Sequence, residues 1–302
     1  MTAEWQLTAA GYAAVVTEVG ATLRELRFQG RDLVVPFDAG QVRPFYRGAT
    51  IAPWPNRIAD GRYSFDGRIY QLPINEVDRH CALHGLVHWV RWDLVSAADD
   101  RLVLQHELVP QDGYPFPLHL RIEYQLSPNG LQTRLTATNT GSTAVPYGCC
   151  PHPYLIAGPG PLDSWSLTVP ADQRLEVDGR LLPTRLTPVD DVDCDFRHPK
   201  PIGGREIDHA FTGIAFSNGR AHVDVVDPAT GAGVRLDWGT WAPWLQIHTA
   251  DRPEPQHNRV GLAVEPMNCP PDAFNHPGGP PLLQSGHTHE AEWKISAFAL
   301  AG

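Results

Sequence analysis

The segment LHLRIEYQLSPNGLQTRLTATN, residues 118–139, decides the fold class of this chain. From Leu118 to Leu126 apolar and polar residues alternate strictly, which is the period of a strand with one buried face. Pro128-Asn129-Gly130 then supplies turn residues, and the alternation resumes from Leu131. The segment therefore predicts a long antiparallel hairpin that lies with one face on a core.

Other parts of the chain show the same strand pattern. Asp66-Gly67, between Tyr63 and Leu72, favours a second hairpin with a type I′ turn. Further strand-like runs are predicted at 13–19, 102–109, 165–169, 221–226, 234–238, 245–249, 261–265 and 293–300. No window of about 12 residues combines a helical period with caps at both ends, and glycine and proline interrupt the chain throughout.

These features predict an all-β fold, a large antiparallel β-sandwich or barrel with very little helix. No break in composition marks a boundary, so residues 1–302 are expected to form a single domain. The proline- and glycine-rich stretch 270–281 is predicted to be a long loop, because a strand follows it. Long loops on a rigid β scaffold are common places for a functional site.

Composition excludes several classes of partner. The formal net charge is −10, with 24 basic and 34 acidic residues, which argues against a nucleic-acid or anionic-membrane binder. Five cysteines, an odd number without Cys-x-x-Cys spacing, favour reduced thiols. The first 20 residues do not resemble a signal peptide, and no apolar stretch is long enough to span a membrane. The protein is expected in the cytoplasm, with a small molecule as its ligand.

Histidine spacing raises two metal-site hypotheses. His80, His84 and His88 would share one face only on a helix, which Gly85 and the neighbouring β-branched residues disfavour. The stretch 287–290, His-Thr-His-Glu, could begin a cupin-like site, but too few residues follow it to supply the remaining ligands. There is also no Gly-x-Ser-x-Gly elbow and no phosphate-binding glycine loop. We therefore predict no metal and no cofactor.

Polar residues beside stiff segments are the stronger candidates for a site. Asn56 and Arg57 follow the segment Ala-Pro-Trp-Pro, and an arginine fork suits sugar hydroxyls or an oxyanion. His84 precedes Gly85, which permits close approach of the backbone to a ligand, although a lone histidine here is also a plausible core residue. His152 lies between two prolines, which makes it a fixed proton donor.

Two carboxylates complete this candidate set. Asp208 stands at the head of the apolar segment 208–211, where it serves either a ligand or a turn. Glu265 ends the apolar run 261–264 and is followed by Pro266. Because charged residues are seldom buried unless paired, Glu265 is either buried for a purpose or a strand-end carboxylate that faces solvent.

Several of these motifs, in this order, resemble the aldose 1-epimerase (galactose mutarotase) family. The resemblance spans roughly residues 45–300, and His-Pro-Tyr-Leu together with Glu-Pro-Met is similar to a divergent bacterial branch. The motifs are Asn56-Arg57-Ile58, Leu83-His84-Gly85, His152-Pro153-Tyr154, Asp208-His209-Ala210-Phe211, AVEPMNCPPDAFN at 263–275 and Gln284-Ser285-Gly286-His287. The resemblance implies the galactose mutarotase-like supersandwich fold and a sugar substrate.

The resemblance also implies roles for individual residues. Glu265 would be the general base at the anomeric hydroxyl and His152 the general acid at the ring oxygen. The sugar-binding side chains would be Asn56, Arg57, His84, Tyr154 and Asp208. Opening a hemiacetal needs one proton removed and another delivered, which two groups of different protonation state can do without metal or nucleotide. The protein is expected to act as a monomer or homodimer.

Two departures from the family pattern leave the sugar open. Pro151 stands where the family often has Asn, and Met267 stands where many members have Gln near the base. Some members of the bacterial branch are linked to sulfoquinovose. The first alternative is therefore a 1-epimerase of an anionic sugar, sulfoquinovose or a hexose 6-phosphate, and the second is a non-catalytic sugar-binding β-sandwich.

The anionic alternative requires a cationic cluster at one end of the cleft. Arg43, Arg47, Arg57 and Arg79 are its candidate residues.

Overall fold

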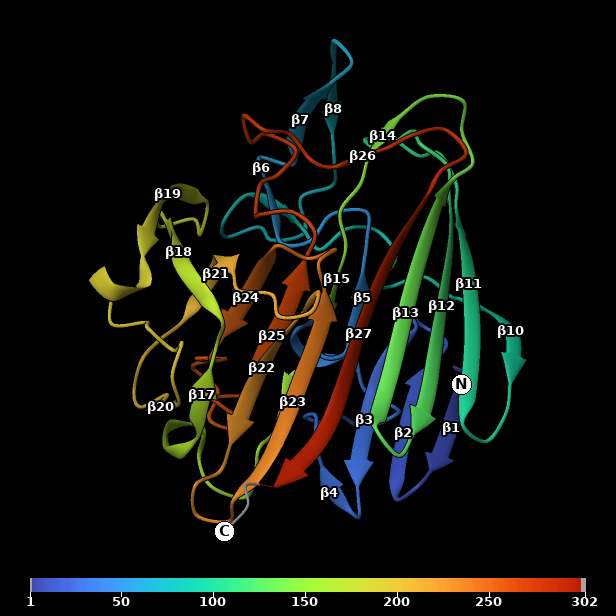
Figure 1. Cartoon of the computed structure of the whole chain (residues 1–302). Coiled ribbons are helices and arrows are strands. Elements are labelled where there is room, and N and C mark those ends of the chain that lie inside the picture. Colours follow the sequence, from blue (N-terminus) through green and yellow to red (C-terminus); the bar gives the residue numbers. More distant parts are fainter. Residues whose placement is uncertain (1, 300–302) are drawn as a thin grey trace.

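The computed structural model describes residues 2–299 and consists almost entirely of antiparallel strands (Figure 1). Its largest sheet has nine strands, built around the hairpin that the segment 118–139 predicted. In spatial order these are β10 (Asp93–Ala97), β11 (Arg101–Leu108), β12 (Leu118–Ser127), β13 (Gly130–Asn139), β27 (Thr288–Ala299), β23 (Ala232–Gly239), β22 (Arg220–Val226), β17 (Ser166–Thr168) and β20 (Lys200–Pro201).

Two further sheets pack with it. The six-stranded sheet contains, in order, β16 (Tyr154–Leu155), β25 (Leu262–Met267), β24 (Trp244–His248), β21 (Asp208–Ile214), β18 (Ala171–Val177) and β19 (Pro183–Pro188). The N-terminal sheet contains β1 (Glu4–Ala9), β2 (Tyr12–Thr17), β3 (Thr22–Phe28) and β4 (Arg31–Asp32). Two strands of this N-terminal sheet, β1 and β2, contact β12, and Figure 1 draws the sheet in blue.

Small two-stranded pairs and short turns complete the fold. The pairs are β5 (Ala49–Ile51) with β15 (Cys150–His152), β6 (Arg57–Ala59) with β9 (Cys81–Leu83), β7 (Arg62–Phe65) with β8 (Arg68–Gln71), and β14 (Val145–Pro146) with β26 (Leu282–Leu283). Within residues 2–299 the only helical elements are 3₁₀ turns, namely η1 (Pro44–Tyr46), η2 (Leu162–Ser164) and η3 (Val189–Asp191).

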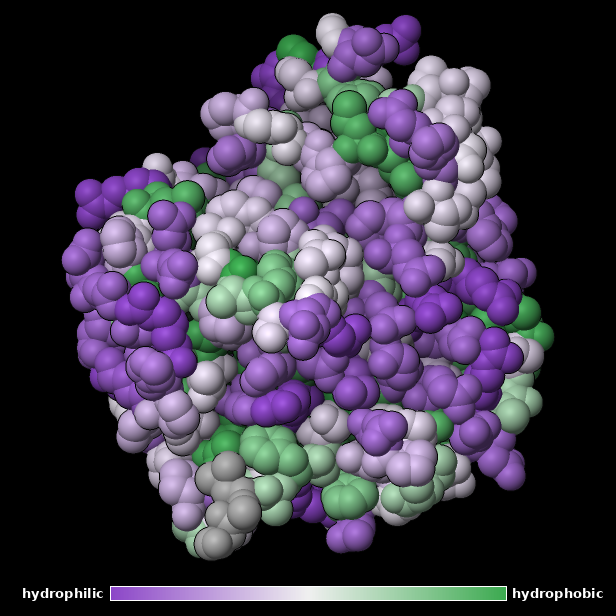
Figure 2. All heavy atoms as spheres, in the orientation of Figure 1, coloured by the Kyte–Doolittle hydropathy of each residue, from purple (hydrophilic) through white to green (hydrophobic). Residues whose placement is uncertain are grey.

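The period-two pattern explains how the sheets pack. In β12 every second residue is buried, and the residues between them are partly exposed. Figure 2 shows that the outward face of the nine-stranded sheet is mostly hydrophilic. One large core cluster joins this sheet to the N-terminal and six-stranded sheets. A fully buried Leu or Ile contributes about 1.5–3 kcal/mol of burial free energy. The Tyr124 hydroxyl also crosses between sheets and donates to the Ala21 carbonyl at 2.6 Å.

The predicted all-β class is confirmed. Asp66 and Gly67 have φ of 49° and 71° between β7 and β8, as a type I′ turn requires. The long loop predicted at 270–281 lies within the strand-free segment 268–281. Leu300, at the end of one predicted strand, lies outside the described residues. All five cysteines are free and buried. No helix among the described residues is long and apolar enough to cross a membrane.

Gly48 ties the N-terminal sheet to the strand that carries His152. Its N–H donates to the His152 carbonyl at 2.8 Å, and its carbonyl accepts from the Leu23 N–H at 2.9 Å. Its φ is +66°, and a Cβ there would lie 1.9 Å from the Leu23 carbonyl oxygen. Only glycine fits this crossing point.

Gly48→Ala is expected to lower the free energy of unfolding by about 3 kcal/mol or more, because it adds a backbone clash to an unfavourable φ. Gly67→Ala is the control, since Gly67 has a similar φ but no atom within 4 Å of its Cβ position, and should cost only about 1 kcal/mol. Chemical denaturation measures both. Equal losses would contradict the clash at Gly48.

Candidate active site

A cavity of about 280 Å³ opens where β15, β21, β24 and β25 meet the loops before β5 and β9. All seven side chains that the sequence singled out line it. The lining residues are Phe45, Tyr46, Asn56, Arg57, Asn75, Glu76, Arg79, Leu83, His84, His152, Tyr154, Asp208, Gln246, His248, Arg252 and Glu265. All of these side chains except Phe45 and Leu83 carry a polar or charged group, which suits a hydroxyl-rich ligand.

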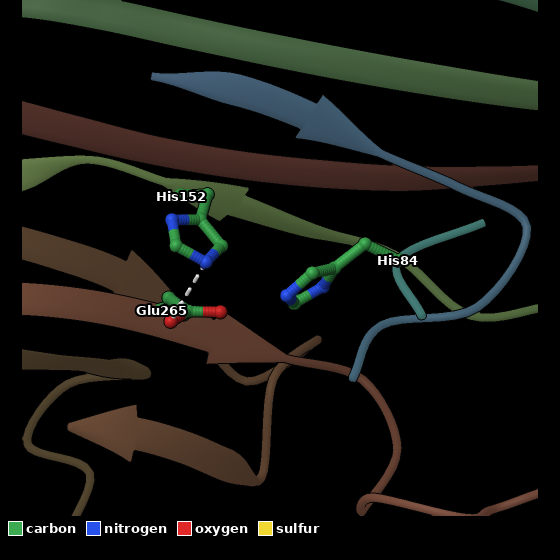
Figure 3. Close-up of side chains that lie close together, drawn as sticks. All are labelled: His84, His152 and Glu265. Atoms are coloured by element: carbon green, nitrogen blue, oxygen red, sulfur yellow. Dashed lines mark ion pairs between the residues drawn. The ribbon is translucent and has the colours of Figure 1, made fainter. Parts of the chain in front are cut away.

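Glu265 and His152 face each other at the floor of this cavity (Figure 3). Glu265 projects from β25 and His152 from β15, and His152 Nε2 lies 3.3 Å from Glu265 Oε1. Only 2% of Glu265 and 5% of His152 is exposed. The carboxylate therefore does not point to solvent, which decides between the two alternatives for Glu265.

Burial controls the protonation of this pair. Loss of hydration raises the pKa of Glu265 well above its usual value, and the nearby Asp208 charge adds to that shift. Loss of hydration also lowers the pKa of His152 to about 3. A carboxylic acid beside neutral imidazole holds the same single proton as a carboxylate beside imidazolium. The pair therefore keeps one proton over a wide pH range, and the nitrogen and oxygen atoms that can hold it lie 3.3 Å apart.

Weakly polar neighbours keep Glu265 poorly solvated. Cys150 Sγ lies 3.9 Å from Glu265 Oε2, at the outer limit of a thiol hydrogen bond. Cys150 and Met267 belong to one buried apolar cluster with Ala49 and Ile51. A thiol is a weak donor and a thioether a weak acceptor, so this side of the carboxylate replaces little of the lost hydration. Met267, the departure from the family pattern, thus contributes to the apolar surroundings of the base.

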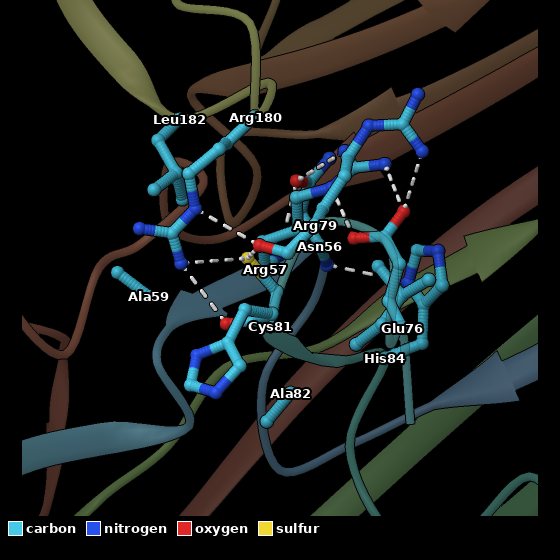
Figure 4. Close-up of polar contacts among 12 residues, drawn as sticks. Asn56, Arg57, Ala59, Glu76, Arg79, Cys81, Ala82, His84, Arg180 and Leu182 are labelled. Carbon is cyan, nitrogen blue, oxygen red and sulfur yellow. Dashed lines mark hydrogen bonds and ion pairs between the residues drawn. The ribbon is translucent and has the colours of Figure 1, made fainter. Parts of the chain in front are cut away.

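Arg57 lies in the cavity wall with a fixed orientation. Its Nε and Nη2 donate to the two oxygens of Glu76 at 2.7 and 2.8 Å, and Arg79 Nη1 donates to Glu76 Oε1 at 3.1 Å (Figure 4). Asn56 Oδ1 accepts from the Arg57 N–H at 2.9 Å. Antiparallel pairing of β6 with β9 holds the backbone of Arg57 opposite Leu83.

His84 has a defined tautomer. The Asn56 backbone N–H donates to His84 Nδ1 at 3.2 Å, so the ring proton lies on Nε2, which is a hydrogen-bond donor. Burial and the neighbouring His152 lower the pKa of His84, which keeps the ring neutral. Gly85 is needed for a reason the sequence did not reveal: a Cβ there would lie 2.1 Å from the Ala52 carbonyl oxygen, so the close approach is to backbone and not to a ligand.

Asp208, at the start of β21, is held by β24. Gln246 Nε2 donates to Asp208 Oδ1 at 2.7 Å, and His248 Nδ1 lies 3.9 Å from the same oxygen. Burial disfavours the charged carboxylate, but His248, Arg57 and Gln246 outweigh it and lower the pKa of Asp208. Asp208 is therefore an ionised acceptor for ligand hydroxyl groups.

The only trio of metal-ligand side chains that converges within residues 2–299 is His84, His152 and Glu265, whose candidate atoms lie within 4.8 Å of one another. Distance alone would permit a metal ion. The His84 tautomer opposes one, because the nitrogen facing the trio carries the proton that a metal would have to replace. His80, His84 and His88 do not lie on a helix, and of the three only His84 belongs to the convergent trio.

The arginines proposed for an anionic sugar divide into two sets. Arg57 and Arg79 line the cavity, but Arg43 and Arg47 do not. Arg43 is buried, donates to Thr22 Oγ1 and to the His88 carbonyl, and lies over the Trp89 ring. Arg47 is buried about 5.8 Å from the centre of the Tyr154 ring.

Sequence reasoning missed several lining residues. Phe45 and Tyr46 occupy the left-handed region, with φ of 46° and 59°, and no local pattern announces this conformation. The Tyr46 ring packs 4.6 Å from His84 and 6.0 Å from His152, measured between ring centres. Strained backbone of this kind is concentrated at functional sites. Glu76 and Arg252 look like ordinary surface charges in the sequence, so only the folded arrangement reveals them.

The chain is similar to known proteins over most of its length. A family model described as aldose 1-epimerase matches residues 4–296. YihR, an uncharacterized protein of Escherichia coli K12, is 37% identical over 290 residues, covering 96% of this chain and 91% of YihR. Galactose mutarotase of Rattus norvegicus is 29% identical over 271 residues, covering 80% of this chain and 75% of the rat protein.

Solved structures share the fold. The GalM/aldose epimerase homologue of C. elegans superposes with a TM-score of 0.87 at 21% identity, over 100% of both chains. Galactose 1-epimerase of Lactobacillus acidophilus NCFM gives 0.78 at 21% identity, over 98% of this chain and 99% of that one. At this identity the likeness establishes the galactose mutarotase-like architecture.

Proposed function

The chain belongs to the aldose 1-epimerase family, and we propose that it interconverts the α and β anomers of a hexose by acid–base ring opening. The observation that carries the proposal is the buried Glu265–His152 pair, 3.3 Å apart, on the floor of a polar cavity. A pure binding protein would have no need to bury a carboxylate against an imidazole, since burial of such a pair is costly. Family membership supports mutarotase-type activity.

In the proposed reaction the shared proton first moves from the Glu265 carboxyl group to His152, which converts the resting carboxylic acid and neutral imidazole to carboxylate and imidazolium. Glu265 takes the proton from the anomeric hydroxyl, the C1–O5 bond breaks with its electrons going to O5, and His152 delivers a proton to O5. Rotation about C1–C2 turns the aldehyde, and reversal of the proton transfers closes the ring as the other anomer. The pair regains its single proton, so no net proton, electron or cofactor is consumed.

The remaining side chains orient the sugar. Arg57 and the His84 Nε2–H offer donors, and Asp208 offers an ionised acceptor. We propose Asn56 as a support for both neighbours, through its backbone bond to His84 and its side-chain bond to Arg57. Tyr154 packs beside His152, with ring centres 5.5 Å apart, and donates its hydroxyl proton to the Phe45 carbonyl.

Arg252 supports a second candidate, an anionic hexose as substrate. It lines the cavity, stacks 4.5 Å from the centre of the Phe45 ring and contacts His248 Nε2 at 3.1 Å. Among residues 2–299 it takes part in no ion pair with a carboxylate. A cation without a counter-charge in a sugar cavity is suited to a phosphate or sulfonate substituent.

Glu265→Gln and His152→Ala are each expected to slow anomer exchange about 10²–10⁴-fold, because each removes one proton-transfer group. NMR exchange spectroscopy on a hexose measures the rate. Glu107→Gln and His119→Ala are matched controls, since they break a carboxylate–imidazole pair on the exposed outer sheet. Parent-like rates in both cavity variants would refute the proposed roles.

Activity should show no acid limb at pH 4.5. An ordinary Glu–His pair would gain its second proton near the normal Glu pKa. Here the pKa of His152 is lowered to about 3, so the pair gains its second proton only when the pH falls to about 3. The pKa of Glu265 is raised, so the pair loses its single proton only when the pH rises past that raised value. The enzyme-catalysed rate, corrected for the spontaneous reaction and with circular dichroism as a folding check, tests this. A limb at pH 4.5 contradicts it.

Arg252→Gln distinguishes the two substrate classes. If the substrate is anionic, this variant should lower kcat/KM for an anionic hexose about tenfold or more, relative to its effect on the neutral hexose, because it removes the unpaired cation. Mutarotation assays on glucose and glucose 6-phosphate give the ratio. An unchanged ratio favours a neutral hexose and removes the role assigned to Arg252.

A further inference from the structure

Glu76 is the acidic residue around which the cationic wall of the cavity is organised. Its carboxylate binds Arg57 through two hydrogen bonds of 2.7 and 2.8 Å and Arg79 through one of 3.1 Å. Only 13% of its side chain is exposed, and 9% of that of Arg57. One negative charge is therefore shared between two guanidinium groups, in the side-on geometry that fixes an arginine most firmly.

The segment that carries Glu76 is itself fixed. Glu76 and Cys81 exchange both backbone hydrogen bonds, 3.2 and 3.1 Å, and so close the turn between them. Arg180, from the turn between β18 and β19, donates to the Arg79 and His80 carbonyls and to Asp60. Figure 4 shows the Arg180 side chain beside Cys81. Hydrogen bonds therefore fix the turn that carries Glu76, and this turn holds the Glu76 carboxylate against Arg57.

This arrangement determines which part of Arg57 a ligand can meet. Nε and one edge of Nη2 face Glu76, and Nη1 makes only a 3.4 Å contact with Asn56 Oδ1. Nη1 is the donor left to the ligand. Of the three arginines that line the cavity, Glu76 offsets the charge of two, whereas Arg252, which stacks on Phe45, has no carboxylate partner within residues 2–299.

We propose that Glu76 is a positioning and charge-selecting residue: it holds Arg57 so that Nη1 meets a neutral sugar hydroxyl, and it prevents the wall of Arg57 and Arg79 from binding an anionic substituent. This inference rests on the proposed function, because it concerns the orientation of the hexose in the same cavity. Because Glu76 offsets the charges of Arg57 and Arg79, Arg252 is the cation left in the cavity to bind an anionic group of a substrate.

Glu76→Gln tests the proposal because it removes the charge and keeps the shape. Glucose 6-phosphate should bind about tenfold more tightly, the size expected when one negative charge several ångströms away is removed in a partly solvated cavity. Glucose should bind about threefold more weakly, because Arg57 loses its fixed orientation. Isothermal calorimetry on the full chain measures both, and the ratio of the two constants is a readout that a merely structural role would not move.

Glu123→Gln is the matched control, because Glu123 binds Arg101 through the same two-bond geometry on the exposed sheet face, and it should leave the ratio unchanged.

Arg79→Gln changes the net charge of the Glu76, Arg57 and Arg79 group in the opposite direction, because it removes a positive charge, and should weaken glucose 6-phosphate binding several-fold. If Glu76→Gln does not fold, Arg79→Gln is the deciding variant. An unchanged ratio in the folded variants overturns the proposal. Calorimetry requires no turnover, so an inactive chain with a shifted ratio would refute only the proposed activity.

Discussion

The removal of Glu265 from water is the constraint that the rest of the site must satisfy. A lone buried carboxylate would cost several kcal/mol. Here an imidazole lies 3.3 Å from the carboxylate, a thiol lies at the limit of contact, and an apolar cluster that includes Met267 packs on the same side. This environment keeps the pair at one proton in total. A group that water would hold ionised is thereby left ready to exchange a proton with whatever enters the cavity.

The side chains that line the cavity come from several different sheets. Arg57 comes from a two-stranded pair, His152 from another, and Asp208 and Glu265 from the six-stranded sheet. Their mutual distances therefore depend on how whole sheets pack. Gly48 illustrates the dependence, since it contacts the N-terminal sheet through Leu23 and the strand of His152 at once. Preorganisation of the site is a property of the core as much as of the site residues.

Sequence reasoning succeeded where the signal was local. Alternation in 118–139 predicted β12 and β13, and Asp66-Gly67 predicted its turn, because both depend on neighbouring residues. Sequence reasoning failed where the pairing register of two strands shifts. A bulge in the pairing of β2 with β3 breaks the period of two, and β3 was not predicted. The candidate residues came from motifs and resemblance, but Glu76 and Arg252 acquire their meaning only through partners far away in sequence.

Some expectations concern matters outside the fold and the site. The cytoplasmic location, the monomeric or homodimeric state and the single domain over residues 1–302 stay predictions.

Pro151 and Pro153 have a consequence for the seam between β15 and β25. These strands lie in contact, yet β15 pairs only with β5, and β25 pairs with β16 and β24. Proline has no N–H, so the segment on either side of His152 has too few donors to continue a ladder. The backbone bonds across this seam lie at its two ends, where the Val264 N–H donates to the Pro153 carbonyl at 3.2 Å and the Asn268 N–H donates to the Cys149 carbonyl at 3.5 Å. Between these ends no ladder joins the two strands, and the side chains of His152 and Glu265 use that freedom to line the cavity.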